Sequence, residues 1–198
     1  MSFRLGLTGG IGMGKSTASG MFRELGHPVW DADAAVHRLY APGGTAVAPV
    51  AAAFPGTLRD GGIDRARLRQ ALAADPSGFP RLEGIVHPLV AADRADFIAR
   101  HAAAPIVVLD IPLLYETGAE TGLDGVAVVS APADVQRARV MSRPGMTEEN
   151  FRLILSRQMP DAEKRQRADW VIPSDTLAGA RVAIMDICDR IMARKPDA

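Results

Sequence analysis

The chain has 198 residues, of which 47% are hydrophobic, and its 23 basic and 23 acidic residues give a formal net charge of zero. This composition is typical of a folded globular protein and excludes a wholly disordered chain. Zero net charge argues against a protein that covers the phosphate backbone of nucleic acid. The single cysteine, Cys188, excludes a disulfide framework and a zinc site built from several cysteines, and its apolar helical surroundings predict an inert core residue.

Short apolar runs alternate with longer amphipathic stretches along the chain. We expect strands at residues 3–8, 28–30, 106–111, 125–130 and 170–172. Helices are expected at residues 15–25, 64–74, 89–103, 132–142, 147–158 and 175–194, with Asp64, Thr147 and Asp175 as N-caps. Strands separated by helices predict βαβ units, hence an α/β fold with a parallel sheet.

The N-terminal segment has neither the basic flank nor the long apolar run of a signal peptide. The longest apolar run, residues 106–114, is interrupted by Asp110 and is too short to span a bilayer. We therefore expect a cytoplasmic protein without a membrane partner, and a monomer or a weak homo-oligomer.

Two stretches interrupt the alternation of strands and helices. Residues 33–101 show helical patterns without a convincing buried strand, and residues 137–164 form an arginine-rich helix pair with a turn at Pro144 and Gly145. Insertions of this kind usually lie over the carboxyl ends of parallel strands, where ligands bind.

The strongest motif occupies residues 9–16, Gly-Gly-Ile-Gly-Met-Gly-Lys-Ser, between a predicted strand and a predicted helix. It fits the phosphate-binding loop pattern G-x-x-x-x-G-K-[ST]. Glycines let successive N–H groups turn toward an anion, and the following helix adds the positive end of its dipole. In such loops the lysine, here Lys15, contacts the β- and γ-phosphates, and the hydroxyl, here Ser16, is a ligand of Mg²⁺.

Three aspartates lie at or just after the ends of predicted strands. Asp31 and Asp33 come after the second strand, where a carboxylate could accept the proton of an acceptor hydroxyl. The alternative, which the pattern alone favours, is an ordinary helix N-cap. Asp110 ends an apolar run, which suits a carboxylate that holds Mg²⁺ through water, with a solvated strand end as the alternative.

Basic residues of the second insertion could stabilise charge on a transferring phosphoryl group. Arg139 and Arg143 are four positions apart and share a face if their helix extends that far, and Arg137 lies nearby. A solvated charged face is the alternative. His87, followed by Pro88, is expected just before a helix, where it could bind a substrate phosphate or cap a turn.

A phosphate-binding loop alone does not separate kinases from other nucleotide-binding proteins. The guanine-reading N-K-x-D motif is absent, which argues against a GTPase. The size and the two polar insertions favour a small-metabolite kinase with a helical lid that excludes water. A kinase for another metabolite and a non-catalytic nucleotide-binding module remain alternatives.

The motifs together resemble those of the dephospho-coenzyme A kinase family, in the same order over nearly the whole chain. The resemblance is carried by Leu7 to Thr17, Asp31-Ala32-Asp33, His87-Pro88, the block from Asp110 to Glu116, Gln136 with Arg139 and Arg143, Gln158-Met159-Pro160, Glu163-Lys164-Arg165 and Ala168-Asp169.

The resemblance implies a P-loop kinase fold and ATP-dependent phosphorylation of the ribose 3′-hydroxyl of dephospho-coenzyme A, with Mg²⁺. It implies a nucleotide-binding core at residues 1–32, 104–136 and 165–198, a helical substrate domain at 33–103 and a lid at 137–164. The implied catalytic residues are Asp33, Lys15 and Arg143. The nucleotide would be bound by Gly10, Ile11, Gly12, Met13, Gly14, Lys15, Ser16 and Thr17, the acceptor by Thr8, Asp33, His87 and Arg139, and the metal by Ser16 and Asp110.

The sequence departs from the family pattern at three places. Met13 stands where a small residue is usual, and we expect its side chain to point outward because the loop needs mainly its N–H. Pro144 follows Arg143 where an acidic residue is more usual, and residues 172–176 lack the common Asn-x-Gly pattern, so no adenine contacts are assigned there.

Overall fold

In the computed structural model, which describes residues 2–193, one sheet has the strand order β2-β5-β1-β6-β7. Its five strands are β1 (Phe3–Thr8), β2 (Val29–Asp31), β5 (Ile106–Asp110), β6 (Gly125–Ser130) and β7 (Trp170–Pro173). Strand β1 runs parallel to β5 and β6, and β6 runs parallel to β7. The predicted α/β fold is confirmed, and each strand begins and ends within one residue of its expected bounds.

The central strands carry the core of the sheet. Every residue of β5 and β6 is buried, as expected where helices cover both faces of a parallel sheet. In the register of the sheet, Leu7 lies opposite Asp110 and Thr8 lies opposite Val128. The loop that follows β1 therefore starts beside the carboxyl end of β5, at the edge where parallel α/β sheets bind ligands.

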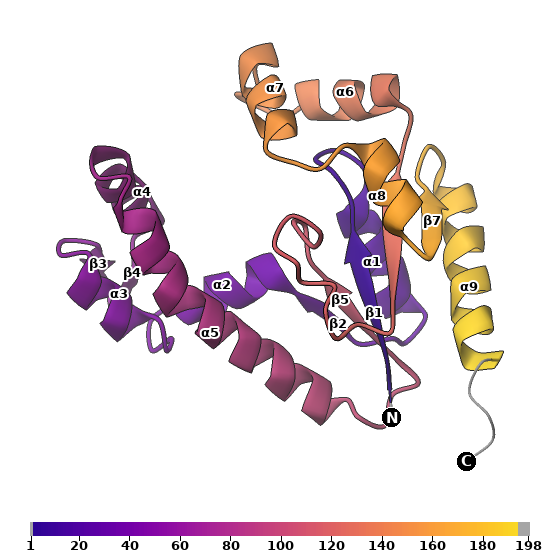
Figure 1. Ribbon diagram of the computed structural model, residues 1–198, viewed down its shortest axis with the longest axis horizontal. Helices are drawn as coiled ribbons and strands as arrows, with labels where there is room; N and C mark the ends of the chain where they lie inside the picture. Colours follow the sequence, from indigo (N-terminus) through magenta and orange to yellow (C-terminus); the bar gives the residue numbers. More distant parts are fainter. Residues whose placement is uncertain (1, 194–198) are drawn as a thin grey trace. The chain divides into compact units, whose positions relative to one another are not determined.

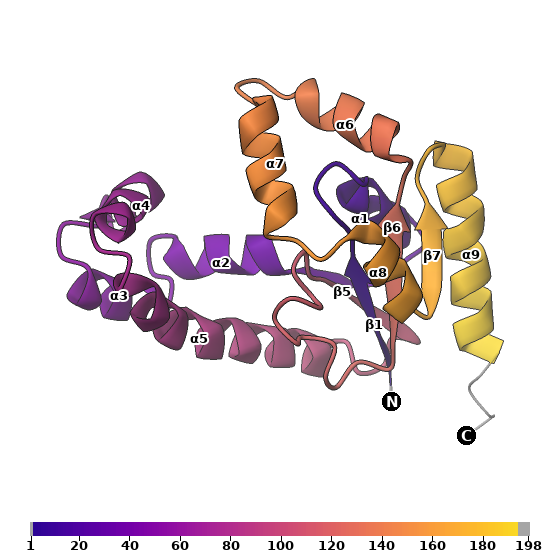
Figure 2. The ribbon, with the colours of Figure 1, turned by 45° about the horizontal axis from the view of Figure 1, so that its top comes forward.

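Helices α1 (Lys15–Glu24) and α9 (Leu177–Ala193) pack on the sheet through one apolar cluster, which includes Phe22 and Ile184. Figures 1 and 2 show α1 behind the sheet and α8 (Asp161–Arg167) in front of it, so helices cover both faces. Cys188 lies in the same cluster, and burial raises the pKa of its thiol to about 11. A thiol of that kind is unreactive, as expected.

The chain divides into two compact units, residues 1–30 with 101–198 and residues 31–100. The second unit contains α2 (Ala32–Tyr40), α3 (Val47–Ala53), the antiparallel strands β3 (Leu58–Arg59) and β4 (Gly62–Ile63), α4 (Arg65–Ala74) and α5 (Gly78–Arg100). Its own core is formed by Leu39, Tyr40, Ala46, Val50, Phe54, Ile63, Leu68, Leu72 and Val86.

Helix α5 corrects the expectation for the segment around Pro88. His87 and Pro88 were expected before a helix, but α5 runs from Gly78 to Arg100 with Pro88 inside it. A proline inside a helix removes one N–H bond and crowds the carbonyl four residues earlier. That earlier residue is Gly84, and α5 continues across the interruption as one helix.

The expected N-caps are confirmed at two helices and wrong at the third. The Asp64 carboxylate accepts the N–H groups of Ala66 and Arg67, at 2.9 and 3.2 Å, and Thr147 Oγ1 caps α7 (Glu148–Ser156). At α9 the cap is Thr176, whose Oγ1 accepts the N–H of Gly179 at 3.1 Å, rather than Asp175. A threonine one residue later supplies the same hydrogen-bond chemistry.

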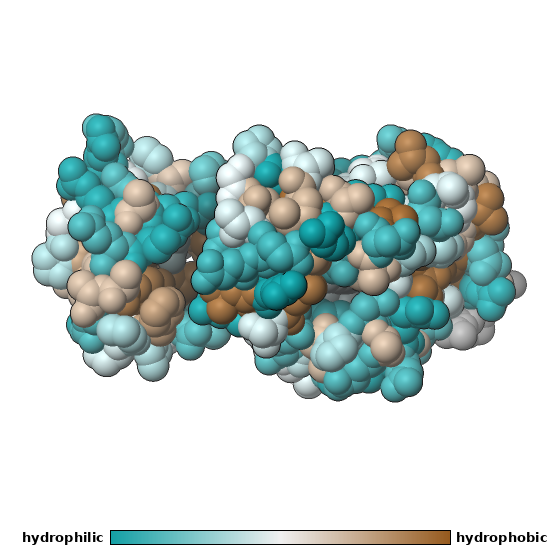
Figure 3. Space-filling model, turned by 90° about the horizontal axis from the view of Figure 1, so that it is seen from above, coloured by the Kyte–Doolittle hydropathy of each residue, from teal (hydrophilic) through white to brown (hydrophobic). Residues whose placement is uncertain are grey.

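Within residues 2–193, no helix combines the length and the apolar character that a membrane span requires. Seen from the side on which α6 (Ala133–Met141) and α7 lie, the surface is a mixture of hydrophilic and hydrophobic residues in which the hydrophilic ones predominate (Figure 3).

Candidate active site

The loop of residues 9–16 connects β1 to α1, as the motif predicts. Gly12 and Gly14 have φ angles of 75° and 88°, in the left-handed region that favours glycine, and Gly14 is the N-cap of α1. In the part of the chain that the structure describes, no acceptor is found for the N–H groups of Gly14, Lys15 and Ser16. Free N–H groups at a helix N-terminus are suited to hold phosphate oxygens.

Lys15 and Asp110 meet at the adjacent ends of β1 and β5. The Lys15 ammonium donates to Asp110 Oδ1, and the Ser19 hydroxyl donates to Asp110 Oδ2. The Asp110 side chain is 1% exposed and that of Lys15 is 16% exposed, so a nearly buried carboxylate is neutralised by a lysine that still reaches solvent. Ser19 carried no signal in the sequence, because only the folded helix α1 brings its hydroxyl under Asp110.

The donors near this loop suit a hard cation. The Ser16 side chain is exposed at the start of α1, and the Asp110 carboxylate lies beside Lys15 of the same loop. Hydroxyl and carboxylate oxygens are the ligands that Mg²⁺ prefers, and Mg²⁺ usually keeps several waters and substrate phosphates in its shell. The described residues contain no group of three or more acidic, histidine or cysteine side chains that could hold a metal by themselves. Ser16 and Asp110 therefore fit a Mg²⁺ ion that arrives with phosphates.

Two glutamine side chains, one in α6 and one after α7, form hydrogen bonds with the backbone of the loop. Gln136 of α6 donates through Nε2 to the carbonyl of Ile11 at 2.8 Å, and Gln158, after α7, accepts the Ile11 N–H at 3.0 Å. Both glutamines belong to motifs of the family pattern, and the structure assigns them the loop backbone as their partner. The conformation of the loop is therefore coupled to α6 and to the segment between α7 and α8.

The expectation that Met13 points outward is wrong. Its side chain is 2% exposed, and its sulfur accepts the N–H of Ala131 at 3.2 Å, just beyond the end of β6. The hydroxyl of Ser174 donates to the Met13 carbonyl at 2.6 Å, which fixes the residue from the other side. A long, flexible thioether can fill the irregular space beside β6 and accept an N–H there. With a small residue at this position, other groups would have to fill the space and accept that N–H.

The three candidate arginines have different surroundings. Arg139 is half-buried, and its guanidinium donates to the Ser174 hydroxyl at 3.1 Å and to the Ser174 carbonyl. Arg137 forms an exposed ion pair with Glu148 at 2.7 Å. Helix α6 ends at Met141, so Arg143 lies beyond it and does not continue the face of Arg139.

Arg143 begins a tight turn on the surface. Its carbonyl accepts the N–H of Met146 at 3.2 Å, and Gly145 has a φ angle of 75°. Proline at the second position and glycine at the third are typical of a type II turn, so Pro144 is compatible with a defined turn here. The Arg143 side chain is exposed, and no partner for it is found among residues 2–193.

The connection between β5 and β6 contains a buried ion pair. Glu116 Oε1 lies 2.7 Å from Lys164 Nζ and accepts the N–H of Met159 at 2.8 Å. Burial raises the pKa of the Glu116 carboxyl, but the ion pair and the hydrogen bonds outweigh burial and hold this pKa below its ordinary value. This pair ties the connection to α8, and thus to the segment that carries Gln158.

Thr8, expected to bind the acceptor, is fully buried at the end of β1. Its hydroxyl donates to the carbonyl of Pro112 at 3.0 Å, so the structure uses it to hold the start of the β5–β6 connection.

The acidic and histidine candidates of the second unit lie on two helices. The Asp31 carboxylate is the N-cap of α2 and accepts the Ala34 N–H at 2.9 Å. Asp33, in the first turn of α2, is exposed, and the structure shows no partner for it within the described residues. His87 is also exposed, on α5. Of the two aspartates, Asp33 is thus the one with a carboxylate free for chemistry.

Comparison with known proteins gives one family over most of the chain. The sequence profile described as dephospho-CoA kinase matches residues 3–178. The chain is 60% identical over 182 residues to a dephospho-CoA kinase of Cereibacter sphaeroides, with 92% of each chain covered. It is 56% identical over 191 residues to a dephospho-CoA kinase of Jannaschia sp., with 96% of this chain and 98% of the relative covered.

Solved structures give the same fold. The crystal structure of TT1252 from Thermus thermophilus is 34% identical, has a TM-score of 0.83 and covers 99% of both chains. A dephospho-CoA kinase from Campylobacter jejuni has a TM-score of 0.67 at 22% identity, with 96% of this chain and 97% of the other covered, which supports the fold alone. These matches extend over the loop, the Asp110 strand and both insertions.

Proposed function

The chain belongs to the dephospho-CoA kinase family, and from this premise we propose that it transfers the γ-phosphoryl group of ATP to the ribose 3′-hydroxyl of dephospho-CoA, giving CoA and ADP. The structure supports this reaction through the arrangement of charged groups at the phosphate-binding loop. Lys15 of the phosphate-binding loop meets the Asp110 carboxylate at the ends of adjacent strands, beside the free N–H groups of α1. This arrangement suits the β- and γ-phosphates of a nucleotide together with a cation.

The acceptor chemistry is assigned to Asp33. The 3′-hydroxyl oxygen forms a bond to the γ-phosphorus while the bond from that phosphorus to the β–γ bridging oxygen breaks, and ADP leaves. Asp33 accepts the proton of the hydroxyl, and its exposed carboxylate, without a partner among residues 2–193, is free to do so. Arg143, at the surface turn after α6, would contribute charge to the transferring group.

Mg²⁺, bound through Ser16 and through water to Asp110, would neutralise charge on the β- and γ-phosphates. Lys15 would contribute a fixed positive charge at the same place, and the loop N–H groups would orient the phosphate oxygens. Positioning and electrostatics thus supply most of the catalysis, because phosphoryl transfer requires little covalent chemistry from the protein.

A product analysis tests the proposal directly. The protein is incubated with ATP, Mg²⁺ and dephospho-CoA, and the products are identified by mass spectrometry and by the ³¹P spectrum of a 3′-phosphomonoester. We expect ADP release that depends on dephospho-CoA, and no release with CoA, whose 3′ oxygen is already phosphorylated. ATP binding without acceptor-dependent ADP release would instead indicate a non-catalytic module, and release with a different acceptor would indicate another kinase.

The proposed substrates also bear on the cellular compartment and on the partners of the enzyme. ATP and dephospho-CoA are small, water-soluble molecules, so a cytoplasmic enzyme without a membrane or nucleic-acid partner suits them. The balanced net charge of the chain is consistent with that setting.

Substitution of the loop lysine tests the nucleotide part of the mechanism. Lys15→Ala removes the ammonium beside Asp110, and we expect kcat to fall about 10²–10³-fold, the size of the loss when one fixed electrostatic contact to a transition state is removed. Steady-state kinetics and a thermal melt measure the effect. If the variant folds and its kcat stays within a few-fold of wild type, Lys15 does not stabilise the transition state.

The close approach of the loop to α6 gives a second test. A Cβ on Gly12 would lie 2.5 Å from Val140 Cγ2, whereas a Cβ on Gly26, which also has a positive φ angle, meets nothing within 4 Å. Gly26→Ala should cost about 1–2 kcal/mol of unfolding free energy for the left-handed backbone, with an unchanged KM for ATP. Gly12→Ala should cost about 1–3 kcal/mol more through overpacking and should raise that KM.

Val140→Ala in the Gly12→Ala background removes the atom in conflict, so the double variant should recover part of the ATP affinity. Chemical denaturation and KM for ATP measure both effects. Equal behaviour of the Gly12 and Gly26 variants would show that α6 does not constrain the loop.

A further inference from the structure

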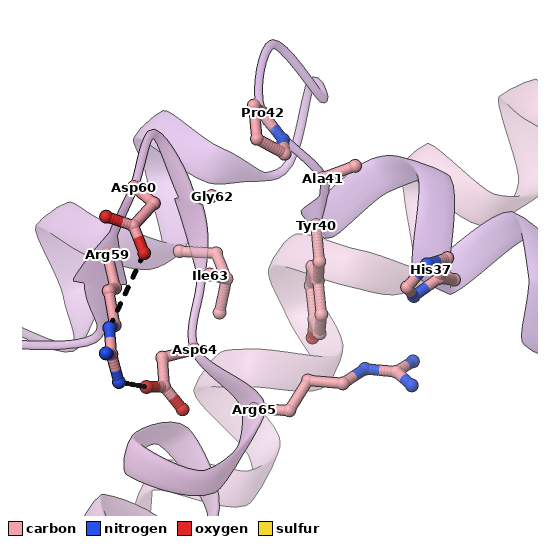
Figure 4. Close-up of a pocket in the computed structure, with 10 residues that line it drawn as sticks. All are labelled: His37, Tyr40, Ala41, Pro42, Arg59, Asp60, Gly62, Ile63, Asp64 and Arg65. Carbon is pink, nitrogen blue, oxygen red and sulfur yellow. Dashed lines mark ion pairs between the residues drawn. The ribbon is translucent and has the colours of Figure 1, made fainter.

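A pocket of about 350 Å³ lies entirely within the second unit, between the end of α2, the β3–β4 hairpin and the start of α4. Figure 4 shows the side chains around it. Its lining is His37, Tyr40, Ala41, Pro42, Arg59, Asp60, Gly62, Ile63, Asp64 and Arg65. Neither the sequence motifs nor the family resemblance assigned a binding or catalytic role to any of these residues.

One wall of the pocket carries an arginine and a histidine, Arg65 and His37. The Arg65 guanidinium lies over the ring of Tyr40, 5.7 Å from its centroid, and Tyr40 is 8% exposed. Figure 4 shows the Arg65 side chain extending toward the side on which His37 lies. Both side chains are exposed, and within residues 2–193 no carboxylate forms an ion pair with either of them. A guanidinium held against an aromatic ring is pre-oriented to bind an oxyanion.

The acidic residues of the pocket lie on the opposite wall and are neutralised there. Arg59 pairs with Asp60 at 3.5 Å and with Asp64 at 3.7 Å. The Asp64 carboxylate also accepts the two N–H groups at the start of α4 and lies 3.6 Å from Arg67. These bonds hold the pKa of Asp64 below its ordinary value. The acidic wall therefore does not cancel the positive charge of the Arg65 guanidinium on the side where His37 also lies.

The spacing along α2 connects this wall with the reaction. Asp33 and His37 are four residues apart on one helix, so their side chains share a face about 6 Å apart along the axis. That separation is comparable with the distance across a ribose from its 3′ oxygen to its 5′ phosphate. An acceptor with its 3′-hydroxyl at Asp33 can thus place its 5′ side at His37 and Arg65.

We infer that the Arg65–His37 wall of this pocket binds the diphosphate of dephospho-CoA. This inference rests on the proposed function. It places the diphosphate, which is attached to the 5′ oxygen of the acceptor's ribose, in this pocket. Arg65 supplies paired N–H donors to the phosphate oxygens, and His37 supplies one ring N–H. Tyr40 is a positioning residue, because its ring holds the guanidinium. The pocket thereby favours acceptors that carry a 5′-diphosphate over nucleosides that lack one.

The test uses Arg65→Gln and His37→Gln in the full-length protein, with Arg69→Gln as the matched control. Arg69 is an exposed arginine on the same helix that does not line the pocket. We expect Arg65→Gln to raise KM for dephospho-CoA about tenfold or more, as the loss of a charge-assisted hydrogen bond implies, with kcat and KM for ATP within about twofold. His37→Gln should give a smaller rise, and Arg69→Gln should behave as wild type.

Salt dependence separates a direct ionic contact from a structural effect. Added NaCl should raise the wild-type KM for dephospho-CoA, and this rise should be shallower in Arg65→Gln because one ionic contact is gone. Arg65→Lys should recover part of the loss. An Arg65→Gln KM within about twofold of wild type, or a rise in KM with unchanged salt dependence, would overturn the inference while leaving the kinase activity intact. Failure of the wild-type protein to phosphorylate dephospho-CoA would overturn the proposed function and the pocket assignment together.

Discussion

Asp33→Asn should lower kcat for dephospho-CoA by about 10²–10⁴-fold, the usual contribution of a positioned general base, while KM for ATP stays within about twofold. Asparagine has the shape of aspartate but cannot take the proton of the 3′-hydroxyl. Asp33 is exposed in the first turn of α2 and has no partner among the described residues, so the substitution removes no structural bond. Steady-state kinetics with each substrate varied in turn measures both quantities.

Asp31 provides a matched control two residues away. Its carboxylate caps α2 by accepting the Ala34 N–H, and asparagine caps helices as well as aspartate does. Asp31→Asn should therefore leave both stability and turnover near the wild-type values. If Asp31→Asn loses as much turnover as Asp33→Asn, the assignment of Asp33 as the sole general base would be contradicted in favour of Asp31. Turnover of Asp33→Asn within a few-fold of wild type would exclude Asp33 as the base.

The parts of the fold that the sequence predicted well are those with strong local signals. Residues 106–109 are all apolar because β5 is buried on both faces, and the loop of residues 9–16 matches the fixed glycine, lysine and serine positions of a phosphate-binding loop. Because strands of a parallel sheet meet at one edge, Lys15 and Asp110 could be expected near each other, and they form an ion pair.

Elements without such signals were missed or misplaced. Alanine-rich α3 and the short β3–β4 hairpin have little periodicity, so the sequence predicted neither of them, although it predicted α4 and its N-cap correctly. Pro88 suggested a boundary, but packing within the second unit maintains α5 across it. Local propensity is a weak guide where tertiary contacts decide.

The loop contacts that the sequence did not predict join distant segments of the chain. Gln158 accepts the Ile11 N–H across 147 positions of sequence, and Ser174 donates to Met13 across 161. The Met13 side chain was expected outside because the loop motif constrains only its backbone. The space beside β6 that receives the Met13 sulfur exists only in the folded sheet.

The buried pair of Lys164 and Glu116 should dominate the stability of this part of the protein. Lys164 is fully buried, and its Nζ lies 2.7 Å from Glu116 Oε1. Lys164→Met leaves the Glu116 carboxylate largely buried without its counter-charge, and we expect a loss of about 3–5 kcal/mol in the free energy of unfolding. Urea denaturation at neutral pH measures the loss.

The double variant Lys164→Met with Glu116→Gln separates the charge from the packing. Glutamine keeps an oxygen for the Met159 N–H, so the double variant has neither a buried charge nor a lost acceptor, and it should recover most of the stability. Arg190→Ala is the surface control, because it breaks the solvent-exposed ion pair between Arg190 and Asp186. It should change the free energy of unfolding by less than about 1 kcal/mol.

The pH dependence of the Lys164→Met effect follows from the direction of the Glu116 pKa. The pKa is lowered in the folded protein, so the ionised pair stabilises the fold above the ordinary pKa of a glutamate, and this contribution is lost as the pH falls through the folded pKa. The difference between wild type and Lys164→Met should therefore narrow in acid. A loss below about 1 kcal/mol at neutral pH, or a double variant no more stable than Lys164→Met, would show that the pair is not what holds the β5–β6 connection to α8.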